Sequence, residues 1–167
     1  DAVGAVGVDG ATTNTGTLDL LADSVSMAGI NNSGNAQVVS TNGGISTGGI
    51  TNSGSMEVNV ATDLVAGVIT HTAGVMDLNA DSLSAQSLGV SGTAGTQVNI
   101  NAPIVAIAGI AKVSGNFVQG GTGGMLNLTA TDFSAQNLTI TGDFIVDAGN
   151  TTYDVAENVS ITGNINV

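Results

Sequence analysis

The sequence contains no cysteine, no arginine and a single lysine, Lys112, against 13 acidic residues, so that its formal net charge is -12. Without cysteine the chain has neither disulfides nor thiolate metal sites. Because nucleic-acid binding requires cationic side chains that neutralise phosphates, we expect no nucleic-acid partner. No apolar run approaches the ~20 residues of a membrane-spanning helix, and we therefore expect no membrane insertion.

Aromatic residues are also scarce, at 2%, although 42% of the residues are hydrophobic. The apolar residues are chiefly Val, Ile, Leu and Ala, and the β-branched ones among them favour a pleated surface over a helix. The 25 glycines and the abundant Asn, Ser and Thr disfavour helix interiors. At 167 residues the chain is long enough for a domain with a core, and its composition predicts an all-β protein.

Short polar segments that end in glycine recur along the chain, for example NNSG, TNSG and HTAG. Between them the same order returns, with an alternating apolar and polar run, a tight corner and a second short run. The stretch at residues 98–110 also lies over residues 18–30 without a gap, with similar apolar residues at matching positions. The glycines that close these segments are spaced 18 to 27 residues apart: Gly34, Gly54, Gly74, Gly92, Gly115, Gly142 and Gly163.

Repeats of this kind predict stacked coils. Alternation with period two buries one face of a strand, and a unit of about 20 residues cannot bury that face alone, so that neighbouring units must stack. We therefore predict a single-chain parallel β-solenoid (β-helix) of about seven coils. A β-sandwich is the alternative, since its strands also recur at short intervals. Residues 1–16 are expected to form an N-terminal strand or assembly segment, and residues 17–167 the solenoid repeats.

The repeat assigns residues to the interior and to the corners. The corner glycines are Gly34, Gly54 and Gly74. His71, the only histidine, aligns with Asn32 and Asn52 and is expected to replace an asparagine in a polar corner stack. Five residues are expected to lie inside: Leu20, Val60, Leu78, Ile100 and Leu128.

The segments ITNSGSMEV, LDLLADS and VNINAP resemble the β-solenoid shafts of bacterial secreted adhesins of the filamentous-haemagglutinin type. The resemblance covers residues from about 16 to 167. It implies a shaft-like structural protein, and with it an extracellular or bacterial cell-surface location.

Catalytic patterns are scarce. A single histidine without a G-x-S-x-G motif does not predict Ser-His-Asp catalysis, and we expect no enzyme. No cofactor is expected, apart from calcium as a weak alternative, because carboxylate oxygens are suitable ligands. The candidate ligands are Asp19, Asp23, Asp77 and Asp81, for which we favour a solvated acidic face over a calcium site.

The two ends of a solenoid carry strand edges that natural monomers cover. Here both ends are apolar, which leaves two interpretations: the segment is part of a longer shaft, or copies of the chain stack head-to-tail into a fibre or surface shaft. We expect the second. The end residues expected to carry this contact are Val3, Val6, Val8, Ile165 and Val167. The alternative is an adhesin-type binding module that recognises a surface glycan or receptor through a side loop at residues 117–124. Its candidate residues are Phe117, Gln119 and Thr122.

Overall fold

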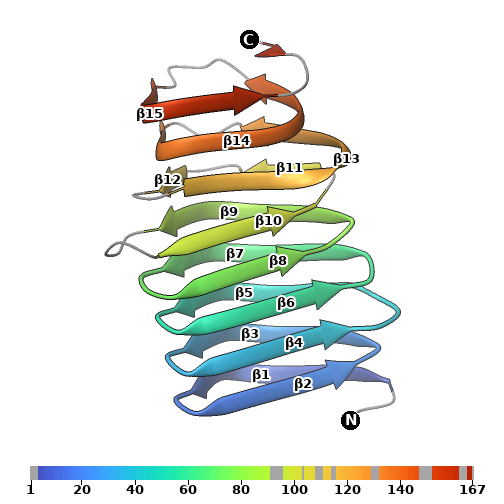
Figure 1. Cartoon of the computed structure of the whole chain (residues 1–167). Coiled ribbons are helices and arrows are strands. Elements are labelled where there is room, and N and C mark those ends of the chain that lie inside the picture. The colour runs from blue at the N-terminus through green and yellow to red at the C-terminus, as the bar shows by residue number, and fades with distance from the viewer. Residues whose placement is uncertain are drawn as a thin grey trace.

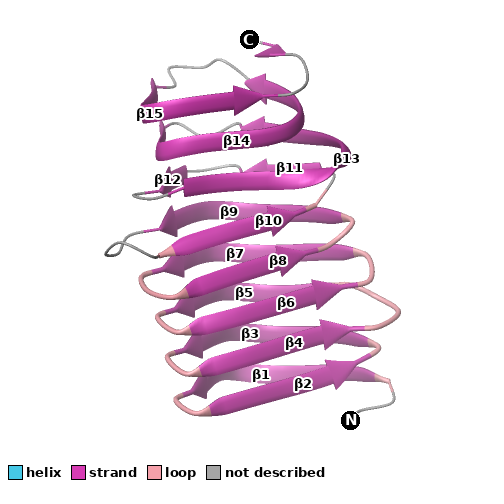
Figure 2. Cartoon of the chain, in the orientation of Figure 1, coloured by secondary structure: helices cyan, strands magenta, loops and turns pink. Residues whose placement is uncertain are grey.

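The alternating runs form strands, and tight corners turn the chain from one strand to the next, so that the molecule is a rod of stacked coils (Figure 1). The fold is that of a computed structural model. It describes residues 4–90, 96–102, 104–107, 111–113, 116–128, 132–146, 152–161 and 165–166. All described strand pairs are parallel, and no described residue is helical (Figure 2).

The first ten strands make five regular turns, each with one strand in either of two facing stacks. The odd stack holds β1 (Ala5–Asn14), β3 (Ser24–Asn32), β5 (Ile45–Asn52), β7 (Asp63–His71) and β9 (Ser82–Val90). The even stack holds β2 (Thr17–Ala22), β4 (Asn35–Ser40), β6 (Ser55–Val60), β8 (Val75–Asn79) and β10 (Gln97–Asn101). Each strand pairs with the strand one turn away, because a parallel neighbour requires a crossover and the other stack provides it.

The remaining strands continue the stack with longer elements. They are β11 (Ile104–Ile107), β12 (Ala111–Val113), β13 (Asn116–Leu128), β14 (Asp132–Val146), β15 (Thr152–Ile161) and β16 (Ile165–Asn166). β13 pairs with β10 over its first part and with β11 over its second part, so that one continuous strand passes from one stack to the other. The predicted parallel β-solenoid is confirmed, with about five regular turns in place of about seven.

The core lies between the two stacks and consists of columns of aliphatic residues. One column runs in register through Leu20, Val38, Val58, Leu78 and Ile100. Its four later members are buried, whereas Leu20, in the first turn, is only partly buried. This column confirms the interior positions predicted for Leu78 and Ile100.

Two other interior predictions lie near the ends of strands. Val60 is buried at the end of β6, as predicted. Leu128 lies in β13 and pairs with Ile107, and its side chain lies outside the described residues.

The predicted corner glycines lie where the chain passes from the odd to the even stack. A Cβ atom on Gly54 would stand 2.1 Å from the carbonyl oxygen of Gly34, and one on Gly34 would stand 2.0 Å from that of Gly16. Gly74 has a φ of 79°, in the left-handed region that favours glycine. Successive corners therefore approach so closely that no side chain fits between them.

The predicted corner at Gly142 does not belong to this series. Gly142 lies within β14 and pairs with Gly124, in the part of the array where β13 and β14 pass from the even to the odd stack. The register of this pair shifts between Gln119 and Gly124, which changes the phase of the repeat. Spacing between glycines alone does not show such a shift.

The segment at residues 1–16 contains β1, which pairs with β3 from Ala5 to Asn14. The strand is thus the first strand of the odd stack. The boundary at residue 16 stays a prediction. None of the described residues forms a helix long and apolar enough to cross a membrane.

Candidate functional site

A row of buried polar side chains runs along the corner between the odd and even stacks. Asn14, Asn32, Asn52 and His71 occupy the same register position in β1, β3, β5 and β7. The amide nitrogen Nδ2 of Asn14 donates to Oδ1 of Asn32 over 2.7 Å, and Nδ2 of Asn32 donates to Oδ1 of Asn52 over 2.7 Å. All four side chains are at least 91% buried. They form a hydrogen-bonded ladder parallel to the axis of the solenoid.

Each asparagine also closes its own corner. Nδ2 of Asn32 donates to the carbonyl oxygen of Gly34 over 3.1 Å and to that of Ser55, one turn on, over 3.0 Å. Oδ1 of Asn32 in turn accepts from the backbone N–H of Gly34 over 3.3 Å. Buried polar groups cost free energy unless they are paired. The repeated bonds of the ladder therefore explain why these side chains take the same geometry in successive turns of an otherwise apolar interior.

His71 ends the ladder. Nδ2 of Asn52 lies 2.9 Å from Nδ1 of His71, and Nε2 of His71 lies 3.0 Å from the carbonyl oxygen of Gly74. A ring with its proton on Nε2 satisfies both contacts, since Nδ1 then accepts and Nε2 donates. Nδ1 also lies 3.2 Å from the carbonyl oxygen of Asn52. The prediction that His71 replaces an asparagine in a polar corner stack is confirmed.

The histidine corner is one residue longer than the asparagine corners. Asn32 and Asn52 bond the carbonyl of the residue two positions on, whereas His71 bonds that of Gly74, three positions on. The inserted residue is Ala73. An imidazole reaches farther than a carboxamide, and the ring therefore spans the longer turn.

The N-terminal end of the ladder is incomplete. Oδ1 of Asn32 and of Asn52 each accepts from a glycine N–H and from the preceding asparagine, whereas the only described donor to Oδ1 of Asn14 is the N–H of Gly16, at 3.2 Å. Asn14 is 9% exposed. Oδ1 of Asn14 is thus an acceptor at which the site for a second hydrogen bond faces out of the first turn.

The same end exposes strand edges and part of the core. Among the described strands, β1 and β2 are the two terminal strands of the array, each paired with a described strand on one side only. We define the N-terminal end face by the edges of β1 and β2 and by five side chains. Four of these are partly buried hydrophobic residues that pack against the core. The five are Val6, Val8, Asn14, Leu18 and Leu20.

Two of the predicted assembly residues, Val6 and Val8, thus lie on the N-terminal end face. Their register partners one turn on, Val25 and Met27, are 3% and 5% exposed, so the partial burial of Val6 and Val8 follows from the position of β1 at the end of the stack.

Of the other predicted assembly residues, Val3 and Val167 lie outside the described residues. Ile165 lies in the short strand β16 and pairs with Phe144. Its side chain is not among those that the structure describes.

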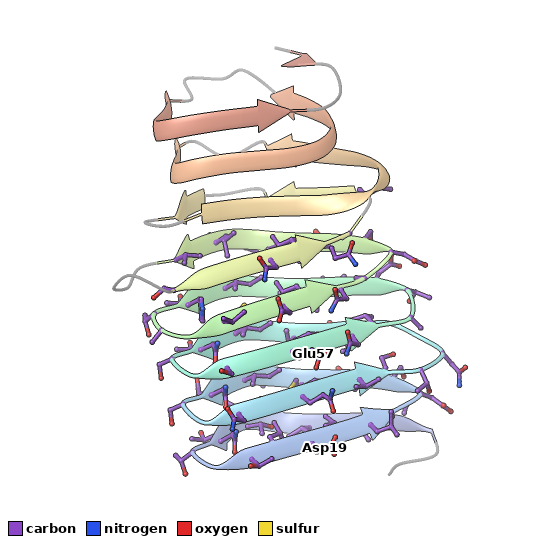
Figure 3. The ribbon with its side chains drawn as sticks, in the orientation of Figure 1. Asp19 and Glu57 are labelled. Atoms are coloured by element: carbon purple, nitrogen blue, oxygen red, sulfur yellow. The ribbon has the colours of Figure 1, made fainter. Side chains whose placement is uncertain are left out.

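Acidic and amide side chains form an outward-facing column on the even stack. Asp19, Gln37, Glu57 and Asp77 lie in consecutive register positions, and Figure 3 shows Asp19 and Glu57 on this face. Asp19 and Asp77 are therefore three strand spacings apart, about 14 Å. Glu57 accepts hydrogen bonds from Asn59 and Gln37, both over 2.9 Å, and these bonds lower the pKa of its carboxyl group.

The other two calcium candidates lie at the opposite corner from the ladder. Asp23 accepts from Nδ2 of Asn42 over 2.7 Å and from Oγ1 of Thr41 over 3.2 Å. Asp81 lies three turns away, where its N–H donates to the carbonyl of Thr62. The structure does not bring the four candidate aspartates together. Within the described ranges, no three His, Cys, Asp or Glu side chains are placed to hold a metal ion.

The segment predicted as a binding loop lies within strand β13. Phe117 and Gln119 pair with Val98 and Ile100 of β10, and Thr122 falls where the register between β13 and β14 shifts. Val98 and Ile100 are buried. The backbone of residues 117–124 is thus part of the β array, while recognition of a glycan or receptor by these residues stays a prediction.

Reasoning from the sequence missed Asn14 and the direction of the ladder. The signal for Asn14 was the segment NTG at residues 14–16, which matches NSG at residues 32–34 and 52–54. The direction of the amides needed the structure, since a sequence does not show which way a side-chain amide donates.

Comparison with known proteins identified no relative. No protein-family model matches the chain, and neither a curated protein nor a solved structure matches it.

Proposed function

We propose that the protein is a structural subunit of an extracellular bacterial fibre or surface shaft, which assembles by end-to-end β-strand stacking of its own copies. The observation that carries this proposal is the N-terminal end face, where two strand edges and four partly exposed core residues end the stack together. A further parallel turn would extend both stacks at once.

The energetics favour such an addition. Full burial of a Val or Leu side chain contributes roughly 1.5–3 kcal/mol, so four partly exposed ones contribute several kcal/mol on stacking. Backbone hydrogen bonds along β1 and β2 add to this term and set the register, as in other cases of strand addition. Together they oppose the roughly 4–15 kcal/mol that association costs.

Charge and composition support the location and the mode of growth. The net charge of -12 favours solubility, and the outward acidic column on the even stack opposes side-by-side contact between rods. The five side chains that define the N-terminal end face are uncharged, although Asp9 of β1 and Asp19 of β2 lie on the same two strands. The absence of cysteine is compatible with a secreted surface protein.

The proposal is tested by blocking the strand edge. Thr17 lies at the start of β2, and its counterpart one turn on, Asn35, donates its N–H to the carbonyl of Gly16 over 2.8 Å. Because Thr17 holds the position of Asn35 in the first turn, its N–H would donate to a carbonyl of an incoming turn. Thr17→Pro removes this donor and places a ring at the edge, where the fold itself tolerates proline.

We expect wild-type protein to form rods whose length increases with concentration in electron micrographs, and Thr17→Pro to remain as single units. Thr17→Ala is the matched control and should still form rods, because it keeps the N–H. Single units of wild-type protein at all concentrations would contradict self-stacking.

A further inference from the structure

We propose that the N-terminal end face selects a solenoid turn that carries asparagine at the ladder corner, and binds it in preference to the C-terminal end of another copy. The preferred partner is thus a parallel β-turn unit with an Asn-x-Gly corner. This inference rests on the proposed function, because self-stacking and the binding of an asparagine-cornered turn use the same edges of β1 and β2.

The first argument is the direction of the ladder. Asn14 and Asn32 each donate from Nδ2 to Oδ1 of the asparagine one turn on. Asn14 therefore presents an acceptor, and not a donor, at the end face. Two N-terminal end faces brought together would oppose two acceptors, which excludes a hydrogen-bonded ladder between them. An incoming turn must supply a donor at this corner.

The second argument is the backbone at the same corner. Ser33 N–H donates to the carbonyl of Asn14 over 2.9 Å, and Ser53 N–H donates to that of Asn32 over 2.8 Å. Thr15 holds the equivalent position in the first turn and carries a hydroxyl group like Ser33 and Ser53. An incoming asparagine would offer its backbone carbonyl to the N–H of Thr15 while its Nδ2 reaches Oδ1 of Asn14. Any residue at this corner offers the carbonyl, and only a residue with a side-chain donor, such as asparagine, also bonds Oδ1 of Asn14.

The third argument is the composition of the chain's own later turns. The ladder column passes from His71 to Val90 and on to Val113. Continued by one residue from the β12–β14 pairing, it reaches Ala135 and then Val155 in β15. In-register stacking of a second copy on the last described residue of this column would therefore set Val155 against Asn14. Valine has no side-chain donor, so this contact leaves the buried oxygen without its second bond.

Oδ1 of Asn14 keeps its bond from the N–H of Gly16, and the loss of the second bond on burial weakens binding by about tenfold. Self-stacking still gains from strand addition and burial of the end-face side chains. The N-terminal end face is thus able to bind its own copy, and an Asn-cornered turn competes successfully for it.

The test uses the whole chain and a labelled 17-residue peptide with the sequence of residues 24–40, which contains one corner and its two strands. A second peptide carries Asn32→Val and is otherwise identical. Binding is measured by fluorescence anisotropy below the concentration at which the chain stacks. We expect the Asn peptide to bind the wild-type chain at least about tenfold more tightly than the Val peptide.

Two chain variants locate the effect. Asn14→Val should abolish the preference for the Asn peptide and should lower the concentration at which copies stack, because valine then meets Val155. Thr17→Pro should abolish binding of both peptides. The comparison of the two peptides on the wild-type chain does not depend on how well either variant folds.

Equal binding of the two peptides, absence of binding by the Asn peptide, or a preference that persists in Asn14→Val would each overturn the inference. Rods without a peptide preference would leave self-stacking intact and refute the selection of asparagine. A peptide preference without rods would support the selection of asparagine and refute self-stacking. The two proposals can therefore fail separately.

Discussion

At the residue scale, the ladder shows how a polar side chain becomes part of an aliphatic core. Asn52 is fully buried, yet its amide bonds Gly54, Asn32 and His71. Such a network is favourable only when all of its members are paired, because a buried unpaired group costs about 1–3 kcal/mol. The ladder therefore specifies register between turns more strictly than aliphatic packing does.

His71 provides a test at this scale. We expect His71→Asn to destabilise the protein by about 1–3 kcal/mol, because the shorter side chain does not span the longer corner to the carbonyl of Gly74. Deletion of Ala73 in the same chain shortens that corner and should recover most of the loss. Urea denaturation of the three proteins measures the effect. Equal stability of His71→Asn and wild type would show that the bond to Gly74 contributes little.

At the scale of the element, the corners set how closely turns approach. The carbonyl of each corner glycine lies where the Cβ of the next one would be, so that glycine is required by contact between backbones. Backbone atoms, unlike the end of a flexible side chain, have little room to move away. Corners therefore tolerate substitution less than the strands between them.

Gly54→Ala should destabilise the protein by about 3 kcal/mol or more, because its Cβ would stand 2.1 Å from the carbonyl oxygen of Gly34. Gly10→Ala is the matched control. A Cβ at Gly10 meets nothing within 4 Å, and its effect should remain within about 0.5 kcal/mol. Thermal unfolding followed by circular dichroism compares the two, and similar melting temperatures would contradict close contact at the corner.

At the scale of the whole molecule, opposing terms control assembly. Each copy carries a net charge of -12, which repels other copies, while the N-terminal end face offers strand edges and apolar side chains. Salt screens the repulsion over a Debye length of about 8 Å at physiological ionic strength but hardly affects the short-range contacts.

We therefore expect rods to form at lower protein concentration as sodium chloride is raised from about 10 to 150 mM, the range over which the Debye length falls from about 30 to 8 Å. Light scattering and electron microscopy measure this change. Thr17→Pro should form no rods at either salt concentration, which separates strand addition from salting-out. Assembly that weakens with salt would show that contacts between opposite charges drive it.

Much of the solenoid was predictable from the sequence. In a parallel solenoid, residues separated by one repeat length lie above one another, so the repeat length alone indicates which residues stack. Period-two alternation therefore identified Leu78 and Ile100 as interior, and the alignment of His71 with Asn32 and Asn52 placed it in the polar row. Where the repeat length changes, this reasoning fails. β13 runs straight through residues predicted to form a loop, and Gly142 falls outside the series of corners.

The sequence alone thus determined the class of fold, the polar row at the corners and the acidic exterior, since each follows from the period and from residue type. The tertiary structure decided the direction of the amides, the burial of Asn14 and the open acceptor at the N-terminal end face. These features depend on the distances between atoms of neighbouring turns, because a hydrogen bond forms only when donor and acceptor lie about 3 Å apart. Composition and spacing do not carry that information.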